Sequence, residues 1–289
     1  MSLISLPGIA KVRRDMLRIN LRTRTLGLIA LTLLVLATVV IVGGLINADD
    51  YAPNYAAKKL WPSLSHLFGT DYMGRDMFAR TLKGLSVSMQ IGFAASLVSA
   101  TIAITLGILA ATLGRGVDRL VNWLVDLSMG IPHLLQLILI SFMLGGGIKG
   151  VAIAVAVTHW PPLTRIIRAE VMQILSAPYV HISRGLGRGR FWVARKHIFP
   201  QILPQCIVGL ILMFPHAILH EAAITFVGFG VPLDMPAVGS ILAESMKHLA
   251  TGMWWLALFP GLALLMVVLL FNALGSNVRL LTDPRSAHR

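Results

Sequence analysis

The sequence predicts an all-α membrane protein with six transmembrane helices and both termini in the cytoplasm. Three observations support this prediction. Of the 289 residues, 56% are hydrophobic and only 13% are charged, whereas charged residues make up about 25% of soluble domains. Six apolar stretches are long enough, at about 20 residues, to cross a bilayer. Basic residues gather in alternate segments between these stretches, which is typical of cytoplasmic loops.

The six predicted spans follow one another with short polar connections. We place them at residues 26–46, 86–113, 118–144, 148–172, 202–222 and 254–276. The first apolar run exceeds the about 7–15 residues of a signal peptide and follows a basic tail. We therefore interpret it as an uncleaved anchor helix.

The distribution of Lys and Arg sets the orientation, because cytoplasmic segments are enriched in them. Of the 25 Lys and Arg residues, 18 lie in the segments that we predict to be cytoplasmic: six in the N-terminal tail, two in the 114–119 turn, seven in the 165–196 region and three at the C-terminal end. The segments predicted to lie outside hold the other seven. The predicted divisions are a cytoplasmic basic tail (1–25), the first transmembrane helix (26–46), a periplasmic loop (47–85), a membrane core (86–277) and a cytoplasmic tail (278–289).

The net charge of +13 does not indicate a nucleic-acid-binding protein. The basic residues recur between apolar runs and do not form one stripe interleaved with aromatic residues. The single cysteine, Cys206, lies in an apolar run, which excludes a disulfide framework and a cysteine metal cluster.

Two outer segments carry turn and charge signals. The 47–85 loop contains GTDYMGRD at 69–76, and its opposite charges predict a segment that folds over the outer face. The 228–253 loop contains VGFGVPLDMP, whose Gly and Pro residues indicate turns. Trp254 and Trp255 follow it, and we expect both at the aromatic belt of the membrane interface.

The fifth span holds candidate pathway residues. Pro204 and Pro215 predict kinks in this span, and kinked spans often line pathways. His216 and His220 share a helix face at i and i+4, with Glu221 adjacent. Neutral imidazole is a ligand of transition metals, so this pair is a candidate for transient metal contacts. Ordinary polar groups of a pore or a helix contact are the favoured alternative.

Asp126 is a further ionisable residue inside a predicted span, the third. Such residues are candidates for a translocation pathway because burial of charge in hydrocarbon is costly. We favour a structural hydrogen bond between helices for Asp126.

A basic segment at 179–200, YVHISRGLGRGRFWVARKHIFP, separates the fourth and fifth spans. It cannot cross the bilayer, because each central Arg costs about 2.5–3.5 kcal/mol. Its glycines, Gly185, Gly187 and Gly189, allow close approach of another backbone. The segment therefore predicts a cytosolic docking element. No GxxxxGK[ST] phosphate-binding loop and no nucleophile arrangement is present, so the sequence does not indicate an enzyme.

This segment resembles the EAA loop of bacterial ABC-importer permeases, with Gly187 as the fixed glycine and a hydrophobic-x-Pro close at Pro200. Four further stretches resemble the C-type subunit of the dipeptide, oligopeptide and nickel branch: FGTDYMGRDMFARTLKGLSVSMQIG (68–92), HWPPLTRIIRAEV (159–171), EAAITFVGFGVPLDMPAVGSIL (221–242) and WWLALFPGLALLMVVLLFNALGSNVRLLTDPR (254–285). Together they cover nearly the whole chain.

The resemblance implies a type I importer fold in the bacterial inner membrane, with cytoplasmic coupling helices at about 177–199. It implies a non-catalytic subunit that forms a pathway with a homologous permease, receives substrate from an extracytoplasmic binding protein, and is driven by two cytosolic subunits that bind ATP and Mg. This chain would hold no cofactor of its own. The implied ATPase-coupling residues are Tyr179, His181, Ser183, Arg184, Gly187, Arg188, Phe191 and Pro200.

One departure from the family pattern is that His181, Ile182 and Ser183 occupy the Glu-Ala-Ala positions. This puts a salt bridge from the Glu position in question. The family's commonest cargo is peptide, and nickel or a metal chelate is the alternative cargo. A channel or secondary transporter without an ATPase is the alternative mechanism, but it would need an intramembrane ion-coupling site for which only Asp126 and Glu221 are available.

Overall fold

The computed structural model describes residues 21–282, which form a bundle of helices. The predictions for residues 1–20 and 283–289, in the two basic tails, lie outside the described residues. Within 21–282 the strand-type pairing is limited to one isolated bridge between Thr70 and Asp76. The α-helices are α2 (Leu21–Leu45), α3 (Met77–Thr112), α4 (Arg115–Gly130), α5 (His133–Met143), α6 (Gly147–Thr158), α7 (Trp160–Leu175), α8 (Pro178–Gly185), α9 (Arg190–Val193), α10 (Phe199–Val227), α11 (Val238–Met246) and α12 (Trp255–Thr282).

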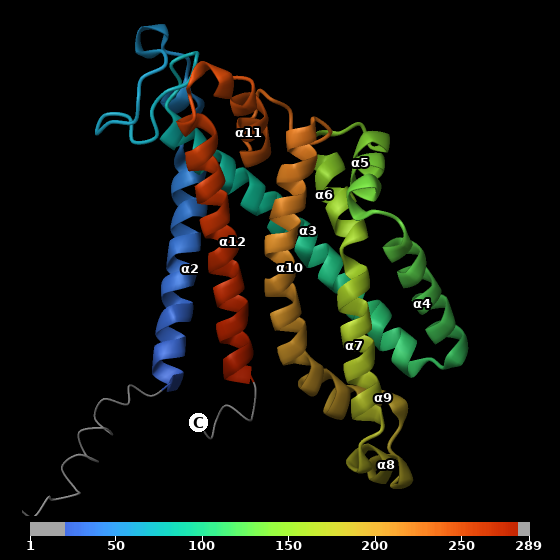
Figure 1. The fold of residues 1–289 in the computed structure, drawn as a ribbon. Helices are drawn as coiled ribbons and strands as arrows, with labels where there is room; N and C mark the ends of the chain where they lie inside the picture. The colour runs from blue at the N-terminus through green and yellow to red at the C-terminus, as the bar shows by residue number, and fades with distance from the viewer. Residues whose placement is uncertain (1–20, 283–289) are drawn as a thin grey trace, which may run out of the picture.

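Shorter helical turns connect these elements. A π-helical turn, η3 (Ala194–Ile198), joins α9 to α10, and three 3-10 turns lie in the loops: η1 (Ala48–Tyr51), η2 (Tyr55–Ala57) and η4 (Leu249–Thr251). Figure 1 shows α2, α12, α10 and α7 running along one direction, while α3 crosses the bundle obliquely. The end that holds η1, η2 and α11 is called here the outer end, and α8 and α9 lie at the opposite end.

Five helices or helix pairs in the described chain are long and apolar enough to cross a membrane, and a sixth span exists if α4 and α5 are counted together. The prediction of a continuous third span at 118–144 is wrong, because α4 and α5 meet at an angle of 93°. Pro132 is the physical reason. A proline disfavours helical geometry in the residue before it, and Ile131 is extended, with φ −97° and ψ 136°.

The helix α3 begins at Met77, nine residues before the predicted start of the second span. Asp76 fixes this start, since its carboxylate accepts hydrogen bonds from the backbone N–H groups of Phe78 and Ala79 at 2.9 and 3.0 Å. The apolar pattern missed this first part of α3 because it carries Arg80 and Lys83. The fifth span is likewise longer than predicted, and Pro204 and Pro215 lie inside the unbroken helix α10.

The helix α3 packs closely against its neighbours through small residues. A Cβ atom on Gly92 would lie 2.7 Å from Ile218 Cγ1 on α10, and one on Gly107 would lie 2.9 Å from Ile167 Cβ on α7. Side chains at these positions would therefore push the helices apart. The small residues of this helix mark its contacts with α10 and α7.

The outer end is closed by an ion-pair network, called here the outer cap, that joins the 69–76 segment to α3 and α11. Asp71 accepts from Arg75 Nε at 2.5 Å and from an Arg80 guanidinium nitrogen at 3.1 Å. Glu244 accepts from Arg75 and Arg80 at 2.5 and 2.7 Å and from the Tyr72 hydroxyl at 2.7 Å. The segment therefore folds over the end of the bundle that holds α11, and its position on the outer side of the membrane stays a prediction.

The outer cap also contains a tryptophan that the sequence places elsewhere. Trp255 is buried and donates its indole N–H to the Thr70 carbonyl at 3.2 Å. The expectation of a membrane-interface position is therefore wrong for Trp255, because its ring fills the core beneath the 69–76 segment. Trp254 is exposed and contacts the Trp61 ring, with 6.5 Å between the ring centroids.

Candidate functional sites: the coupling hairpin and two cavities

The basic segment forms a helical hairpin from α8 through η3, called here the coupling hairpin, that extends past the ends of α2 and α12 (Figure 1). Its root is packed into the bundle. Val180, Val193 and Ile198 are buried in one cluster with Val171 and Ile174 of α7. This apolar root holds the hairpin in a fixed position relative to α7 and α10.

Polar contacts hold the two arms of the coupling hairpin together. Ser183 Oγ of α8 lies 3.0 Å from His197 Nε2 of η3, and the Tyr179 hydroxyl of α8 donates to Gln201 Oε1 in the first turn of α10 at 2.9 Å. Arg188 lies over the Trp192 ring, 5.0 Å from its centroid. Gly187 turns the chain with φ of +80°, a conformation that glycine adopts without steric cost.

The tip of the coupling hairpin combines exposed apolar and basic side chains. Leu186 is 77% exposed and Phe191 is 81% exposed, and Ile182 is also exposed. Among the predicted coupling residues, His181, Arg184, Arg188 and Pro200 are exposed as well, and Ser183 is partly buried. Large apolar groups that are exposed together are typical of surfaces that contact another protein or a membrane.

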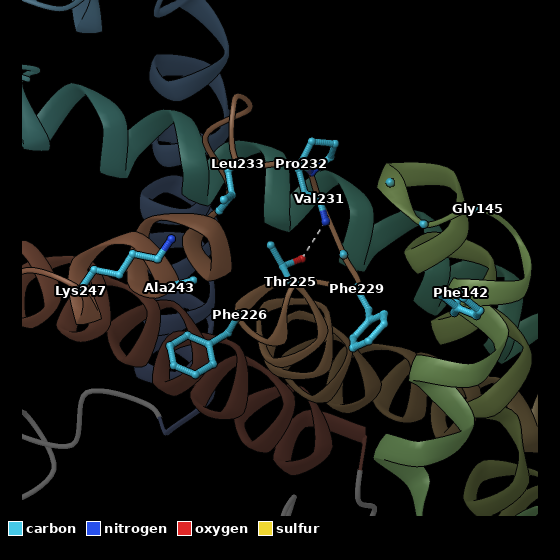
Figure 2. A pocket seen from close by; sticks show the side chains of 14 residues that line it. Phe142, Gly145, Thr225, Phe226, Phe229, Val231, Pro232, Leu233, Ala243 and Lys247 are labelled. Atoms are coloured by element: carbon cyan, nitrogen blue, oxygen red, sulfur yellow. Dashed lines mark hydrogen bonds between the residues drawn. The ribbon is translucent and has the colours of Figure 1, made fainter.

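An outer cavity of about 660 Å³ lies between the α5–α6 turn, the end of α10 and α11. Figure 2 shows Phe226, Phe229, Leu233 and Lys247 around it, with a hydrogen bond from the Val231 N–H to Thr225 Oγ1, 3.1 Å long. Its lining is apolar apart from a few groups such as the Lys247 ammonium.

Two more hydrogen bonds fix the 228–231 loop beside this cavity. Ser141 Oγ donates to the Phe229 carbonyl at 2.7 Å, and the Gly147 N–H donates to the Gly230 carbonyl at 3.1 Å. The turn signals in VGFGVPLDMP therefore correspond to a loop that forms one wall of the outer cavity.

A second cavity, called here the histidine cavity, has a volume of about 1010 Å³. It lies among the α4–α5 bend, the α6–α7 break, α10 and the end of α12. Four histidines line it: His133, His159, His216 and His220. The rings of His133, His159 and His220 are in mutual contact, with centroids 4.5–5.0 Å apart.

The predicted pathway residues of α10 do not all line the same cavity. His216 and His220 both line the histidine cavity, and His216 is exposed there. Glu221 lines neither cavity. It is fully buried, and its Oε1 accepts from Thr225 Oγ1 at 2.9 Å. Its carboxylate therefore supports the loop beside the outer cavity.

Asp126 makes an ion pair with Arg165, which joins α4 to α7. Asp118 and Arg168 make a second ion pair between the same helices. The expectation of a structural contact between helices is confirmed for Asp126, and neither cavity is lined by it.

The sequence did not indicate that His133 lines a cavity or that His159 lies beside His220. One signal was available. Pro132 directly precedes His133, and Pro161 and Pro162 directly follow Trp160, so each histidine stands at a proline-marked helix end. The histidines come from positions 26 and 61 residues apart along the chain, and their convergence depends on how the broken helices fold back.

The fold and these sites define a multi-pass helical membrane permease. The family model described as "Binding-protein-dependent transport system inner membrane component" matches residues 103–288. This chain belongs to that family, and it is the inner-membrane permease subunit of an ABC importer.

Several proteins are similar to this chain over most of its length. A putative peptide transport system permease protein of Brucella suis is 35% identical over 279 residues, which are 96% of this chain and 92% of that protein. The dipeptide transport system permease protein DppC of Alkalihalophilus pseudofirmus is 33% identical over 260 residues, 90% of this chain and 84% of that protein.

A solved structure titled "Inward facing conformations of the MetNI methionine ABC transporter" shares the fold. A chain of that structure aligns with a TM-score of 0.56 and 19% identity, covering 72% of this chain and 98% of that chain. This level of identity supports the shared fold alone.

Proposed function

We propose that this chain imports peptides, and that its coupling hairpin is the contact through which a cytosolic ATPase drives it. The exposed apolar and basic tip of the hairpin is the observation that carries the coupling proposal. Leu186 and Phe191 would be buried by the partner, and the surrounding arginines would contact acidic or carbonyl groups. A separate ATPase is supported by the membership of this chain in a family of inner membrane components of binding-protein-dependent transport systems.

The proposed assembly contains this chain, a homologous permease, two ATP-binding subunits and an extracytoplasmic solute-binding protein. ATP and Mg would be bound by the ATPase subunits, and this chain would be non-catalytic. We place the coupling hairpin and both termini in the cytoplasm and the outer cap in the periplasm, in agreement with the Lys and Arg distribution. Closure of the ATPases would move the hairpin and, through its packed root, α7 and α10.

The translocation pathway would run along the helices that line the two cavities. The histidine cavity, at about 1010 Å³, lies at the upper end of the about 300–1,000 Å³ typical of small-molecule sites. It would therefore accommodate a short peptide. Of the predicted pathway residues, His216 and His220 keep this role in the proposal.

Peptide is favoured over nickel or a metal chelate because the similar proteins are named as peptide and dipeptide permeases. Membership of a binding-protein-dependent family argues against a channel or secondary transporter without an ATPase. The cargo is tested by ATP-driven uptake of labelled dipeptides and of a nickel chelate into proteoliposomes that contain the whole complex. Uptake of the chelate without uptake of any peptide would overturn the peptide proposal.

The coupling proposal is tested by Phe191→Asp, which places a charge at the hairpin tip without disturbing a buried contact of this chain. Leu64→Asp is the matched control, since Leu64 is 99% exposed in the outer loop. We expect the ATPase subunits to be lost from the purified complex of Phe191→Asp and retained in that of Leu64→Asp. Full ATPase retention and full uptake by Phe191→Asp would contradict docking at this tip.

A further inference from the structure

The described chain contains one cluster of metal-ligating side chains, and its three histidines come from three separate places in the fold. His133 begins α5, His159 lies between α6 and α7, and His220 lies in the outer half of α10. One ring nitrogen of each lies within 4.8 Å of the others. No carboxylate takes part in this cluster among residues 21–282.

The hydrogen bonds of His159 leave one of its nitrogens available to bind a cation. Its Nδ1 lies 3.0 Å from the Val155 carbonyl oxygen, which can only accept, so Nδ1 carries the proton. The other nitrogen, Nε2, then presents a lone pair. It is buried and has no hydrogen-bond partner within residues 21–282, and His159 as a whole residue is 9% exposed. Backbone bonding of one imidazole nitrogen is the arrangement that orients metal-binding histidines.

We propose that His133, His159 and His220 form a three-imidazole site for a borderline divalent transition metal ion such as Zn²⁺, Co²⁺ or Ni²⁺. Three neutral imidazoles with an open fourth position are an established donor set for Zn²⁺. With metal–nitrogen bonds of about 2.0–2.1 Å in a tetrahedral site, the nitrogens would lie about 3.4 Å apart, so each ring would move inward by less than about 1 Å. The side-chain torsions of histidine accommodate such a movement.

The site excludes the commoner hard cations by its chemistry. Mg²⁺ and Ca²⁺ prefer oxygen ligands, and the cluster offers nitrogen alone. The open fourth position faces the histidine cavity, which these three residues line. Water or a ligand within that cavity would therefore complete the coordination. The bound ion would connect α5, the α6–α7 break and α10, which otherwise meet at this level through side-chain contacts.

The test is a titration of the purified whole complex, stripped of metal with a chelator, with Co²⁺ alone. We expect one Co²⁺ per copy of this chain, with the intense visible absorption of four-coordinate cobalt, and displacement of Co²⁺ by Zn²⁺. Loss of an outer-shell partner weakens metal binding by about 10–100-fold, so we expect His159→Ala, which removes a ligand, to weaken it by more than this.

His216→Ala is the matched control for Co²⁺ affinity, because His216 lines the same cavity one helical turn from His220 but lies outside the cluster. It should bind Co²⁺ as the unaltered protein does. His220→Cys should retain binding through its thiolate and add a sulfur-to-cobalt charge-transfer band, which shows that the site has formed in a folded variant. Absence of saturable Co²⁺ binding to the unaltered complex, or equal affinity in His159→Ala and His216→Ala, would overturn the proposal.

Uptake of dipeptide by the same preparation separates this inference from the proposed function. Co²⁺ binding without peptide uptake would support the metal site and contradict the peptide cargo. Peptide uptake without Co²⁺ binding would support the cargo and overturn the metal site.

Discussion

The two ends of the molecule differ in how their charged residues are paired. At the outer cap, Asp71, Arg75, Arg80 and Glu244 are buried or partly buried, and each is paired within the chain. At the coupling hairpin, none of the basic residues forms an ion pair within residues 21–282: Arg184, Arg188, Arg190, Arg195 and Lys196. The charges of the outer cap are therefore satisfied within this chain, whereas those of the coupling hairpin stay available for the ATPase partner that we propose.

The largest expected effect on stability comes from breaking the outer cap. Arg80→Met would leave Asp71 and Glu244 with Arg75 as their shared cationic partner, and removal of one member of a buried ion pair costs about 3–5 kcal/mol. We expect the free energy of unfolding to fall by about this amount in thermal or denaturant unfolding of the purified permease. Lys58→Met is the control, since Lys58 is exposed and lies over the Tyr55 ring. Equal stability of the two variants would show that the network contributes little.

Two glycines with nearly the same backbone conformation allow a sharper comparison of the two ends. Gly74 has φ of +79° and Gly187 has φ of +80°. A Cβ on Gly74 would lie 1.8 Å from the Asn54 carbonyl oxygen, whereas one on Gly187 would meet nothing within 4 Å. Both alanine variants incur the left-handed backbone cost of about 1–2 kcal/mol, and Gly74→Ala adds an overpacking cost of about 1–3 kcal/mol.

We therefore expect Gly74→Ala to lower the unfolding midpoint more than Gly187→Ala does. Gly189→Ala serves as the baseline, because its φ is −69° and its Cβ would meet open space. The reverse order of Gly74→Ala and Gly187→Ala would mean that the hairpin turn, and not the outer cap, is the more constrained region.

The mildest perturbation is acid. Burial raises the pKa of Glu244, but the contacts with Arg80, Tyr72 and Arg75 lower it by more than burial raises it. The resulting pKa is about 2. Because this value lies below the ordinary carboxyl pKa of 4.5, the stabilisation by Glu244 is complete above about pH 4.5 and is lost as the pH falls toward 2. We expect the stability difference between the unaltered permease and Glu244→Gln to shrink in this window and to stay constant above it. A difference that shrinks near neutral pH would contradict this assignment.

The sequence predicted the features that depend on neighbouring residues. The apolar runs located five spans, and the third predicted span is the bent pair of α4 and α5. The density of arginines at 184–196 indicated the hairpin. The charges of GTDYMGRD indicated the segment that forms part of the outer cap. Glu244, which binds Tyr72 and Arg75 of this segment, lies 169–172 residues away, and no local pattern indicates it.

The features that the sequence did not predict arise from long-range folding. The apolar pattern predicts one span at 118–144, but the chain bends at Pro132, where α4 and α5 meet at 93°. That bend brings His133 to His159 and His220, and no spacing in the sequence relates these three residues. His216 and His220 have the spacing of a ligand pair on one helix, but the three-dimensional fold pairs His220 with residues from other helices.

The length of α3 has a mechanical consequence. Its 36 residues extend about 54 Å at 1.5 Å per residue, against about 30 Å of hydrocarbon. The helix is therefore longer than the hydrocarbon core is thick, and Figure 1 shows it crossing the other long helices diagonally. One continuous helical rod joins the outer cap at Asp76 to the turn before Arg115 at the other end of the bundle. A small change in its inclination would swing these two ends in opposite directions, so this rod can act as a lever between the two ends of the bundle.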